Sequence, residues 1–427
     1  MAAPTTSPRG AAAGDRPAAG RVRPRDAALG HWNSAVTSYY VMAGASAILL
    51  VIGLVMVLSS SSVDSLLASD GASPYGLFLN QARFAIIGLV FAAIASRLKV
   101  ATVKRWAWPV MFAAIAAQAL VFTPLGYERG GNRNWILVAG QSLQPSEVGK
   151  LALAVWLGLV LARKRHLLHQ WLHVMVPAVL GAAGLVGLVL LGHDLGTAIV
   201  MLLLVAGAFF VAGVPLRMFA VAAALALAGV VALAQASDNR VARITAFFSD
   251  DCDRLGACYQ TTRGLYGLGS GGWTGVGLGE STEKWSYLPE AHNDFIFAIL
   301  GEELGLLGTL VVLVLFALLA FGMSRVIRRH EDPFVQITTA AIATWVLGQA
   351  VVNIAVVIGL LPVIGVPLPL VSAGGTALVT TMAALGLVLS FARSEPGAPE
   401  AFAARPGAVR RSLAVLGRPS KPTASRG

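Results

Sequence analysis

Residues 288–321 read LPEAHNDFIFAILGEELGLLGTLVVLVLFALLAF. The first half of this stretch carries acids and a histidine, and the second half is apolar for long enough to cross about 30 Å of hydrocarbon. Removing a carboxylate from water is costly, and membrane-spanning helices rarely contain an acid without a functional reason. The stretch therefore predicts a membrane-spanning helix with a functional site at its polar end.

The composition of the whole chain agrees with a membrane protein. The 427 residues are 56% hydrophobic and 12% charged, with a mean hydropathy of +0.72, whereas a soluble domain has about 25% charged residues. Apolar runs of spanning length lie near residues 39–58, 77–96, 106–124, 144–162, 174–191, 195–213, 219–235, 292–321, 335–360 and 372–392. The sequence predicts an all-α polytopic membrane protein with about ten transmembrane helices.

The charges indicate how the chain is oriented. The net charge is +11, and 23 of the 32 Lys and Arg residues lie in the two tails and in four short segments on one side of the predicted bundle. The short loops on the other side, 59–76, 192–194 and 361–370, contain none. This positive-inside pattern places both termini in the cytoplasm and explains the basicity by topology and anionic lipid, not by nucleic acid.

Three regions are expected. Residues 1–34 and 394–427 are rich in Pro, Ala and Arg and predict disordered cytoplasmic tails. Residues 35–393 form the ten-helix membrane domain, with one large extracellular loop, 236–291, between spans seven and eight. Cys252 and Cys258 lie in that loop, where they either form a disulfide or remain free thiols, and they are too few for a metal site.

Asp294 is the strongest candidate for chemistry. A helix starting at Pro289 would place Glu290 and Asp294 on one face, where Asp294 is either a general base with a raised pKa or a helix cap. Glu302, two turns further along, and Glu303 are expected to pair with cations on neighbouring helices.

Several cations are suited to a phosphate. Glu147 and Lys150 at i, i+3 predict either a self-satisfied ion pair or a phosphate-binding lysine. Arg133, beside glycines and Trp135, suits a bidentate grip on phosphate or a headgroup anchor. The run from Gly267 to Gly279 has seven glycines in 13 positions; it predicts a loop whose backbone approaches a bulky ligand, not a nucleotide site.

The motifs of the chain, taken in order, resemble one family. They are Gly131–Ile136 (GNRNWI), Leu143–Lys150 (LQPSEVGK), Asp194–Thr197 (DLGT), Gly275–Gly279 (GVGLG), Leu288–Phe297 (LPEAHNDFIF), Gly301–Gly305 (GEELG), Asn353–Ile354 (NI), Gly359–Gly365 (GLLPVIG) and Leu368–Ser372 (LPLVS). The chain resembles the SEDS family (shape, elongation, division and sporulation), in particular its cell-division branch, over about residues 35–393. Asn293 stands where a threonine is usual, and Ala373 where a tyrosine is common.

The resemblance implies a peptidoglycan glycosyltransferase that polymerises lipid II, with Asp294 matching the family's essential aspartate. Asp294 would deprotonate the acceptor sugar 4-hydroxyl, and polyprenyl pyrophosphate would leave without protonation. We expect substrate-binding side chains at Arg133, Glu147, Lys150, Arg243, Lys284, Glu290 and His292, and cavity-lining or structural roles for Glu302, Asn353 and Ser372. No organic cofactor is expected, and a divalent Mg or Mn ion could bind the pyrophosphate.

By the same resemblance, the partners are lipid II, the growing glycan strand, a class B penicillin-binding protein that acts as transpeptidase, and other division proteins at the septal plasma membrane. Three alternatives stay open: a lipid II flippase without chemistry, a glycosyltransferase of the elongation branch, and a non-catalytic scaffold.

Overall fold

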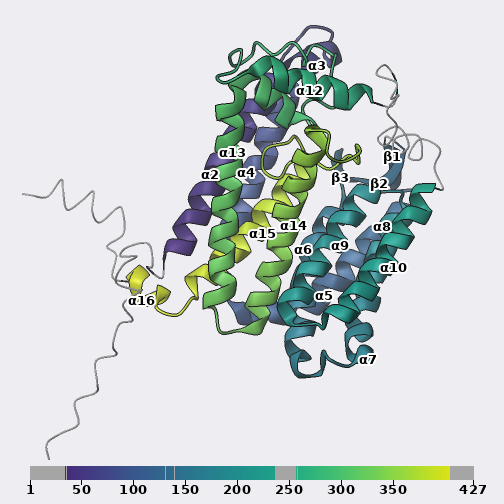
Figure 1. The fold of residues 1–427 in the computed structure, drawn as a ribbon, viewed down its shortest axis with the longest axis vertical. Helices are drawn as coiled ribbons and strands as arrows, with labels where there is room; N and C mark the ends of the chain where they lie inside the picture. Colours follow the sequence, from purple (N-terminus) through teal and green to yellow (C-terminus); the bar gives the residue numbers. More distant parts are fainter. Residues whose placement is uncertain are drawn as a thin grey trace, which may run out of the picture.

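The computed structural model describes residues 34 and 36–403, apart from 130, 139, 236–255 and 257. Within that part of the chain, nine helical segments are long and apolar enough to cross a membrane. They are α2 (Thr37–Ser60), α4 (Gly76–Ala95), α5 (Val100–Ala119) continued by η2 (Leu120–Phe122), α6 (Pro145–Arg163), the run Trp171–Leu191 made of α7 (Trp171–Val174), η4 (Met175–Val179) and α8 (Leu180–Leu191), α9 (Leu195–Ala212), α13 (Ile296–Arg329), α14 (Pro333–Val357) and α15 (Gly375–Arg393). Figure 1 shows them packed side by side as one bundle. The predicted all-α polytopic membrane fold is confirmed.

One predicted span differs from the others. Helix α10 (Leu216–Gln235) matches the expected run 219–235 and packs against α9 at the edge of the bundle (Figure 1). It is not among the nine spanning segments. The expected count of about ten crossings thus corresponds to these nine segments together with α10. The cytoplasmic placement of both termini stays a prediction.

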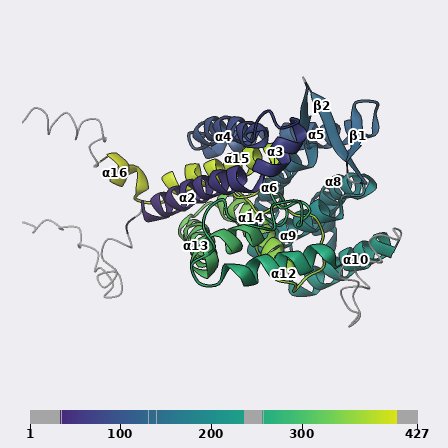
Figure 2. The same ribbon diagram turned by 90° about the horizontal axis from the view of Figure 1, so that it is seen from above.

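Helix α6 is the most enclosed of the nine. Its apolar window is 83% buried, against 22% for α4, because α6 packs on α5, α9, α14 and α15 near the middle of the bundle (Figure 2). Only a helix surrounded by protein can carry charged side chains across a bilayer without exposing them to lipid. This is where the predicted pair of Glu147 and Lys150 lies.

The short elements gather at the two ends of the bundle (Figure 1). One end carries α3 (Ser62–Ala68), α12 (Tyr259–Gly271) and a three-stranded antiparallel sheet in the order β1 (Gly126–Arg129), β2 (Asn132–Val138) and β3 (Gln141–Leu143). The other end carries η3 (Arg165–Leu167) and α16 (Ala398–Ala403). The sheet is the one departure from an all-α fold in the described residues, and its register pairs Ile136 with both Gly126 and Leu143.

Helix α13 is broken at Gly305, whose φ of +67° is open to glycine and costly for other residues. The glycine-rich segment fills this break: the backbone N–H groups of Val276 and Gly277 donate to the carbonyls of Glu302 and Glu303 at 3.0 and 3.1 Å. A Cβ on Gly275 would collide with the Glu303 carbonyl. The glycines therefore let loop backbone approach helix backbone, and the expectation that they make room for a bulky ligand is not needed to explain them.

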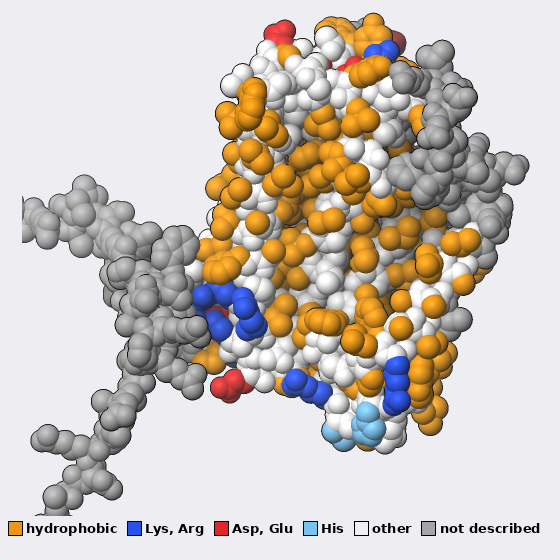
Figure 3. All heavy atoms as spheres, in the orientation of Figure 1, with side chains coloured by type: hydrophobic (Ala, Val, Ile, Leu, Met, Phe, Trp, Pro, Cys, Tyr) orange, Lys and Arg blue, Asp and Glu red, His pale blue; other side chains and the backbone are white. Residues whose placement is uncertain are grey.

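The surface of the bundle agrees with a membrane setting. In Figure 3, hydrophobic side chains cover the middle of the molecule, and most of the visible Lys and Arg side chains lie at the end that carries η3 and α16. This is the end predicted to face the cytoplasm.

The ordered part of the chain extends past the boundary expected at residue 394. The Glu395 side chain is fully buried, and its carboxylate lies 3.5 Å from Nε of Arg329. The ring of Phe402 in α16 packs edge-on against Tyr39 of α2 at 5.3 Å. Residues 394–403 therefore dock on the bundle.

Candidate functional site

Asp294 lies in a turn that leads into α13. Residues 291–295, here called the α13 lead-in, form turns, and the helix begins at Ile296 with Phe295 as its N-cap. The expected helix start at Pro289 is wrong, because Glu290 adopts a φ of +55° and its carbonyl accepts from the N–H groups of Asn293 and Phe295. Proline is as suitable for a turn as for a helix start. Glu290 and Asp294 therefore do not share a helix face, and Asp294 is not the N-cap.

The backbone of the lead-in is held at three consecutive carbonyls. The His292 carbonyl accepts from the N–H of Ala373 at 2.9 Å. The Asn293 carbonyl accepts from Ser372 Oγ at 2.7 Å, and the Asp294 carbonyl accepts from Asn353 Nδ2 at 2.7 Å. The lead-in is thus fixed by the C-terminal part of α14 and by the connection between α14 and α15.

The Asp294 side chain, by contrast, is half-buried. Its Oδ2 faces Gly365 in the α14–α15 connection, where a Cβ would lie 3.4 Å away. Gly365 has a φ of +72°, so a glycine is favoured there for its backbone. A half-buried carboxylate on a backbone held at three carbonyls is suited to receive a proton from a bound substrate.

The α14–α15 connection is itself anchored from two directions. Gln81 of α4 donates to the Ser372 carbonyl at 3.2 Å and accepts from the N–H of Gly374 at 3.1 Å. Asn353 Nδ2 also donates to the Val366 carbonyl at 2.8 Å. A hollow of about 10 Å³ lies between this connection and α15, which is room for about one water molecule.

His292 has a partner that sequence reasoning did not find. Its Nδ1 lies 3.0 Å from Oδ2 of Asp64 in α3. Glu290 is exposed and accepts from Asn293 Nδ2 at 2.5 Å. These side chains place two carboxylates and an imidazole around the lead-in, on the same end of the bundle as Asp294.

Lys150 lies in the interior, away from solvent. Its Nζ is 2.9 Å from Oε1 of Glu147, donates to Gln349 Oε1 at 3.2 Å, and lies 4.9 Å from the centre of the Trp345 ring. Gln349 Nε2 in turn donates to the Pro367 carbonyl at 2.8 Å. The self-satisfied ion pair is present, and Lys150 supports the connection through Gln349.

Glu302 and Glu303 are both bound by groups outside α13. Glu302 accepts from Ser281 Oγ at 2.5 Å and from the N–H and Oγ1 of Thr282 at 2.9 and 2.7 Å. Glu303 accepts from Ser59 Oγ at 2.5 Å and lies 3.5 Å from Nζ of Lys284. The expectation of cations on neighbouring helices is wrong: the loop before α13 supplies the hydroxyl and N–H partners of Glu302 and the cation, Lys284, that pairs with Glu303. The neighbouring helix α2 contributes the Ser59 hydroxyl to Glu303.

The other predicted phosphate ligands are scattered. Lys284 is buried against Glu303 and the Gly279 carbonyl. Arg133 is exposed, and its guanidinium donates to the carbonyls of Val121 and Thr123 at 3.2 Å each. Arg243 and Cys252 lie outside the described residues, and Cys258 is disulfide-bonded. The structure therefore does not gather Arg133, Lys150 and Lys284 around one point.

Helix α12 and the loop 272–290 that leads toward α13, together called the cap here, contain an acid whose pKa is raised. Glu283 lies 3.5 Å from Arg263 of α12, which also stacks over Tyr287 at 4.9 Å. Burial raises the pKa of Glu283, and the Arg263 charge opposes that rise. This ion pair connects α12 to the loop that binds Glu302.

Comparison with known proteins decides the family. The profile of the cell cycle protein family FtsW/RodA/SpoVE matches residues 40–396. The chain belongs to this family. The motif-based prediction of the SEDS family is thereby confirmed.

Relatives within the FtsW/RodA/SpoVE family span most of the chain. A Mycobacterium tuberculosis protein named "Probable peptidoglycan glycosyltransferase FtsW" is 38% identical over 387 residues, which cover 90% of this chain and 73% of that protein. A Halorhodospira halophila protein of the same name is 36% identical and covers 89% of this chain and 97% of that protein.

Solved structures share the fold. A chain from a structure described as "Structural coordination of polymerization and crosslinking by a peptidoglycan synthase complex" superposes with a TM-score of 0.68 at 27% identity, covering 83% of this chain and 98% of that one. The rod shape determining protein RodA of Thermus thermophilus gives a TM-score of 0.62 at 28% identity, covering 83% and 97%.

Proposed function

We propose that this chain is a peptidoglycan glycosyltransferase of cell division that polymerises lipid II, with Asp294 as the general base. The relatives' names support the enzyme class. The geometry that carries the finer proposal is the lead-in: three held carbonyls and a half-buried carboxylate beside Gly365.

The reaction is a single displacement at the anomeric carbon of the donor. Asp294 accepts the proton of the acceptor 4-hydroxyl while that oxygen forms a bond to the anomeric carbon, and the bond from that carbon to the pyrophosphate oxygen breaks. Polyprenyl pyrophosphate leaves as an anion, so it needs positive charge near it and no acid. The configuration at the anomeric carbon inverts.

Charge for the leaving group would come first from Arg133, because its guanidinium is exposed and has donors beyond the two bonds to Val121 and Thr123. A Mg or Mn ion bound mainly by the pyrophosphate is the complementary source. In the described part of the chain, no group of three His, Cys, Asp or Glu side chains is placed to hold a metal ion. Chelation with EDTA during turnover tests this: an ion-dependent reaction stops and recovers on adding Mg.

We also propose a class B penicillin-binding protein as the partner, with the complex located at the division septum. The similar chain from a peptidoglycan synthase complex that couples polymerization to crosslinking supports this, because crosslinking requires a transpeptidase. Co-purification of the tagged pair from membranes tests the partner.

The test of the proposed function uses purified full-length protein in proteoliposomes with labelled lipid II. Wild type with its partner should yield glycan ladders on a gel and release polyprenyl pyrophosphate. Asp294→Asn should bind lipid II and yield neither product. A flippase without chemistry would translocate lipid II and give no ladder in either protein; ladders from Asp294→Asn at the wild-type rate would overturn the role of Asp294.

A further inference from the structure

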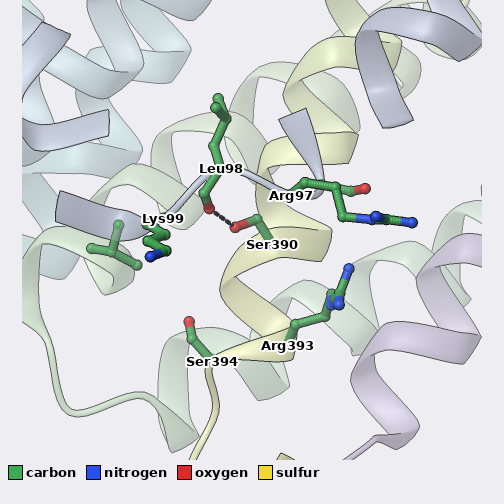
Figure 4. A pocket seen from close by; sticks show the side chains of 8 residues that line it. Arg97, Leu98, Lys99, Ser390, Arg393 and Ser394 are labelled. Carbon is green, nitrogen blue, oxygen red and sulfur yellow. Dashed lines mark hydrogen bonds between the residues drawn. The ribbon is translucent and has the colours of Figure 1, made fainter. Parts of the chain in front are cut away.

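A second polar hollow lies at the end of the bundle opposite Asp294. It measures about 290 Å³ and sits between the α4–α5 connection and the end of α15 (Figure 4). The residues that line it are Ser96, Arg97, Leu98, Lys99, Val100, Ser390, Arg393 and Ser394. Three of them are cations and none is an acid.

The hollow is built on a fixed turn. Ser390 of α15 donates its Oγ to the Leu98 carbonyl, which fastens the α4–α5 connection to α15. Lys99 is the N-cap of α5, its side chain makes no capping bond, and the first turn of α5 has no acid. The positive end of the α5 dipole therefore adds to the cations at this place.

The positive charge is not neutralised within the described residues. Arg97, Lys99 and Arg393 form no ion pair there, and Arg393 instead lies 5.7 Å from the Phe402 ring. Figure 4 shows the side chains of Arg97 and Arg393 on the same side of the hollow. Two guanidinium groups in one place repel each other unless an anion lies between them.

Two acids near this end are paired with other cations. Asp332 is paired with Lys104 at 2.6 Å, and Glu395 with Arg329 at 3.5 Å. Neither lines the hollow. Because none of the residues that line the hollow is an acid, an anion that enters it meets positive charge that the lining itself does not neutralise.

We propose that this hollow binds the phosphate headgroup of an anionic lipid in the inner leaflet. Guanidinium groups hold phosphate oxygens in pairs, and a lysine adds a point charge. The hydroxyls of Ser96 and Ser394 already donate to the carbonyls of Ala93 and Phe391, so the three cations supply the binding. The volume is near the lower limit of small-molecule sites, about 300 Å³, which suits a headgroup. The side chains of Ile94 and Leu98 beside it are 55% and 37% exposed, and they provide an apolar surface for the acyl chains.

The test is lipid binding by native mass spectrometry of the full-length protein in detergent, titrated with phosphatidylglycerol and, separately, phosphatidylcholine. The triple variant Arg97→Gln/Lys99→Gln/Arg393→Gln should lose at least about tenfold in phosphatidylglycerol affinity, given what each cation contributes near an anionic surface. The matched control, Arg163→Gln/Arg165→Gln/Arg217→Gln, removes three exposed cations at the same end and should stay within about twofold of wild type.

Two competition arms identify the source of the phosphate. Glycerol 3-phosphate should compete weakly, because it lacks acyl chains; competition as strong as that of the lipid would assign the site to a soluble phosphate and overturn the lipid proposal. If a polyglutamate peptide displaces bound phosphatidylglycerol at a lower concentration than added phosphatidylglycerol does, the site prefers an acidic protein segment. That result would also overturn the lipid proposal. Equal losses of phosphatidylglycerol affinity in the two triple variants would show that the effect is general charge attraction, and would overturn the proposal of a specific site.

Discussion

Asp294 and Glu302 lie eight positions apart in one motif-rich stretch, yet the structure treats them in opposite ways. At Asp294 the backbone is held by Asn353 while the side chain stays half-buried beside Gly365. At Glu302 the side chain is 1% exposed and accepts bonds from Ser281 and Thr282. The Glu302 carboxylate is held by hydrogen bonds to its side chain, whereas Asp294 is positioned through its backbone carbonyl and its side chain stays half-buried.

The largest effect is expected from Asp294→Asn. Removing a general base costs about 10²–10⁴-fold in rate, while the unfolding midpoint should change little because the Asp294 carbonyl keeps its bond to Asn353. Product gels and thermal unfolding measure the two quantities. The control is Glu280→Gln, an exposed acid of the cap, which should polymerise like wild type; an equal loss there would point to general charge on the cap.

Glu302→Ala should act on stability. The loss leaves the buried hydroxyl of Ser281 without an acceptor, which costs about 1–3 kcal/mol, and also removes the acceptor of the exposed Thr282. We expect a lower unfolding midpoint and faster proteolysis of residues 281–284, with the rate per folded molecule close to wild type. A fully stable but inactive variant would remove the distinction between the two acids.

Asn353→Ala should fall between these cases. It removes the donor to the carbonyls of Asp294 and Val366, so the carboxylate is less well positioned and kcat should drop by about tenfold with a small change in KM. The control on the same helix is Thr344→Ala, whose hydroxyl bonds only to carbonyls of its own helix. A change in KM alone would make Asn353 a substrate-binding residue.

The smallest effect concerns pH and the cap. Burial raises the pKa of Glu283, so the folded cap holds the proton more tightly than the unfolded chain does. Cap stability should then fall as pH rises from near 4.5, the ordinary value, through the raised pKa. Hydrogen exchange of α12 across this range measures it, and Glu283→Gln should remove the dependence. Increasing protection with rising pH in wild type would contradict the sign.

The sequence predicted the spans well, because a run such as 195–213 is defined by hydropathy alone and α9 matches it closely. It could not predict the start of α13, because Pro289 fits both a helix and a turn and the positive φ of Glu290 has no sequence signal. Gln81, which anchors the α14–α15 connection, could have been singled out from the sequence because it is a glutamine inside an apolar span.

The sequence identified residues of the candidate site but did not predict which of them contact one another. Asp294 was singled out by its acid-rich stretch, whereas the contacts of His292 with Asp64 and of Glu303 with Ser59 join positions more than 200 residues apart. Charge type alone also suggested that Lys150 and Lys284 serve one phosphate. Their carboxylate partners, Glu147 and Glu303, show that they are paired in separate places.

The most direct test of the contrast between the two acids measures polymerisation per folded molecule and the unfolding midpoint together, in Asp294→Asn and Glu302→Gln. The account predicts that Asp294→Asn loses rate and keeps its midpoint, whereas Glu302→Gln loses midpoint and keeps its rate. The reverse pattern, or parallel losses of both quantities in both variants, would contradict it.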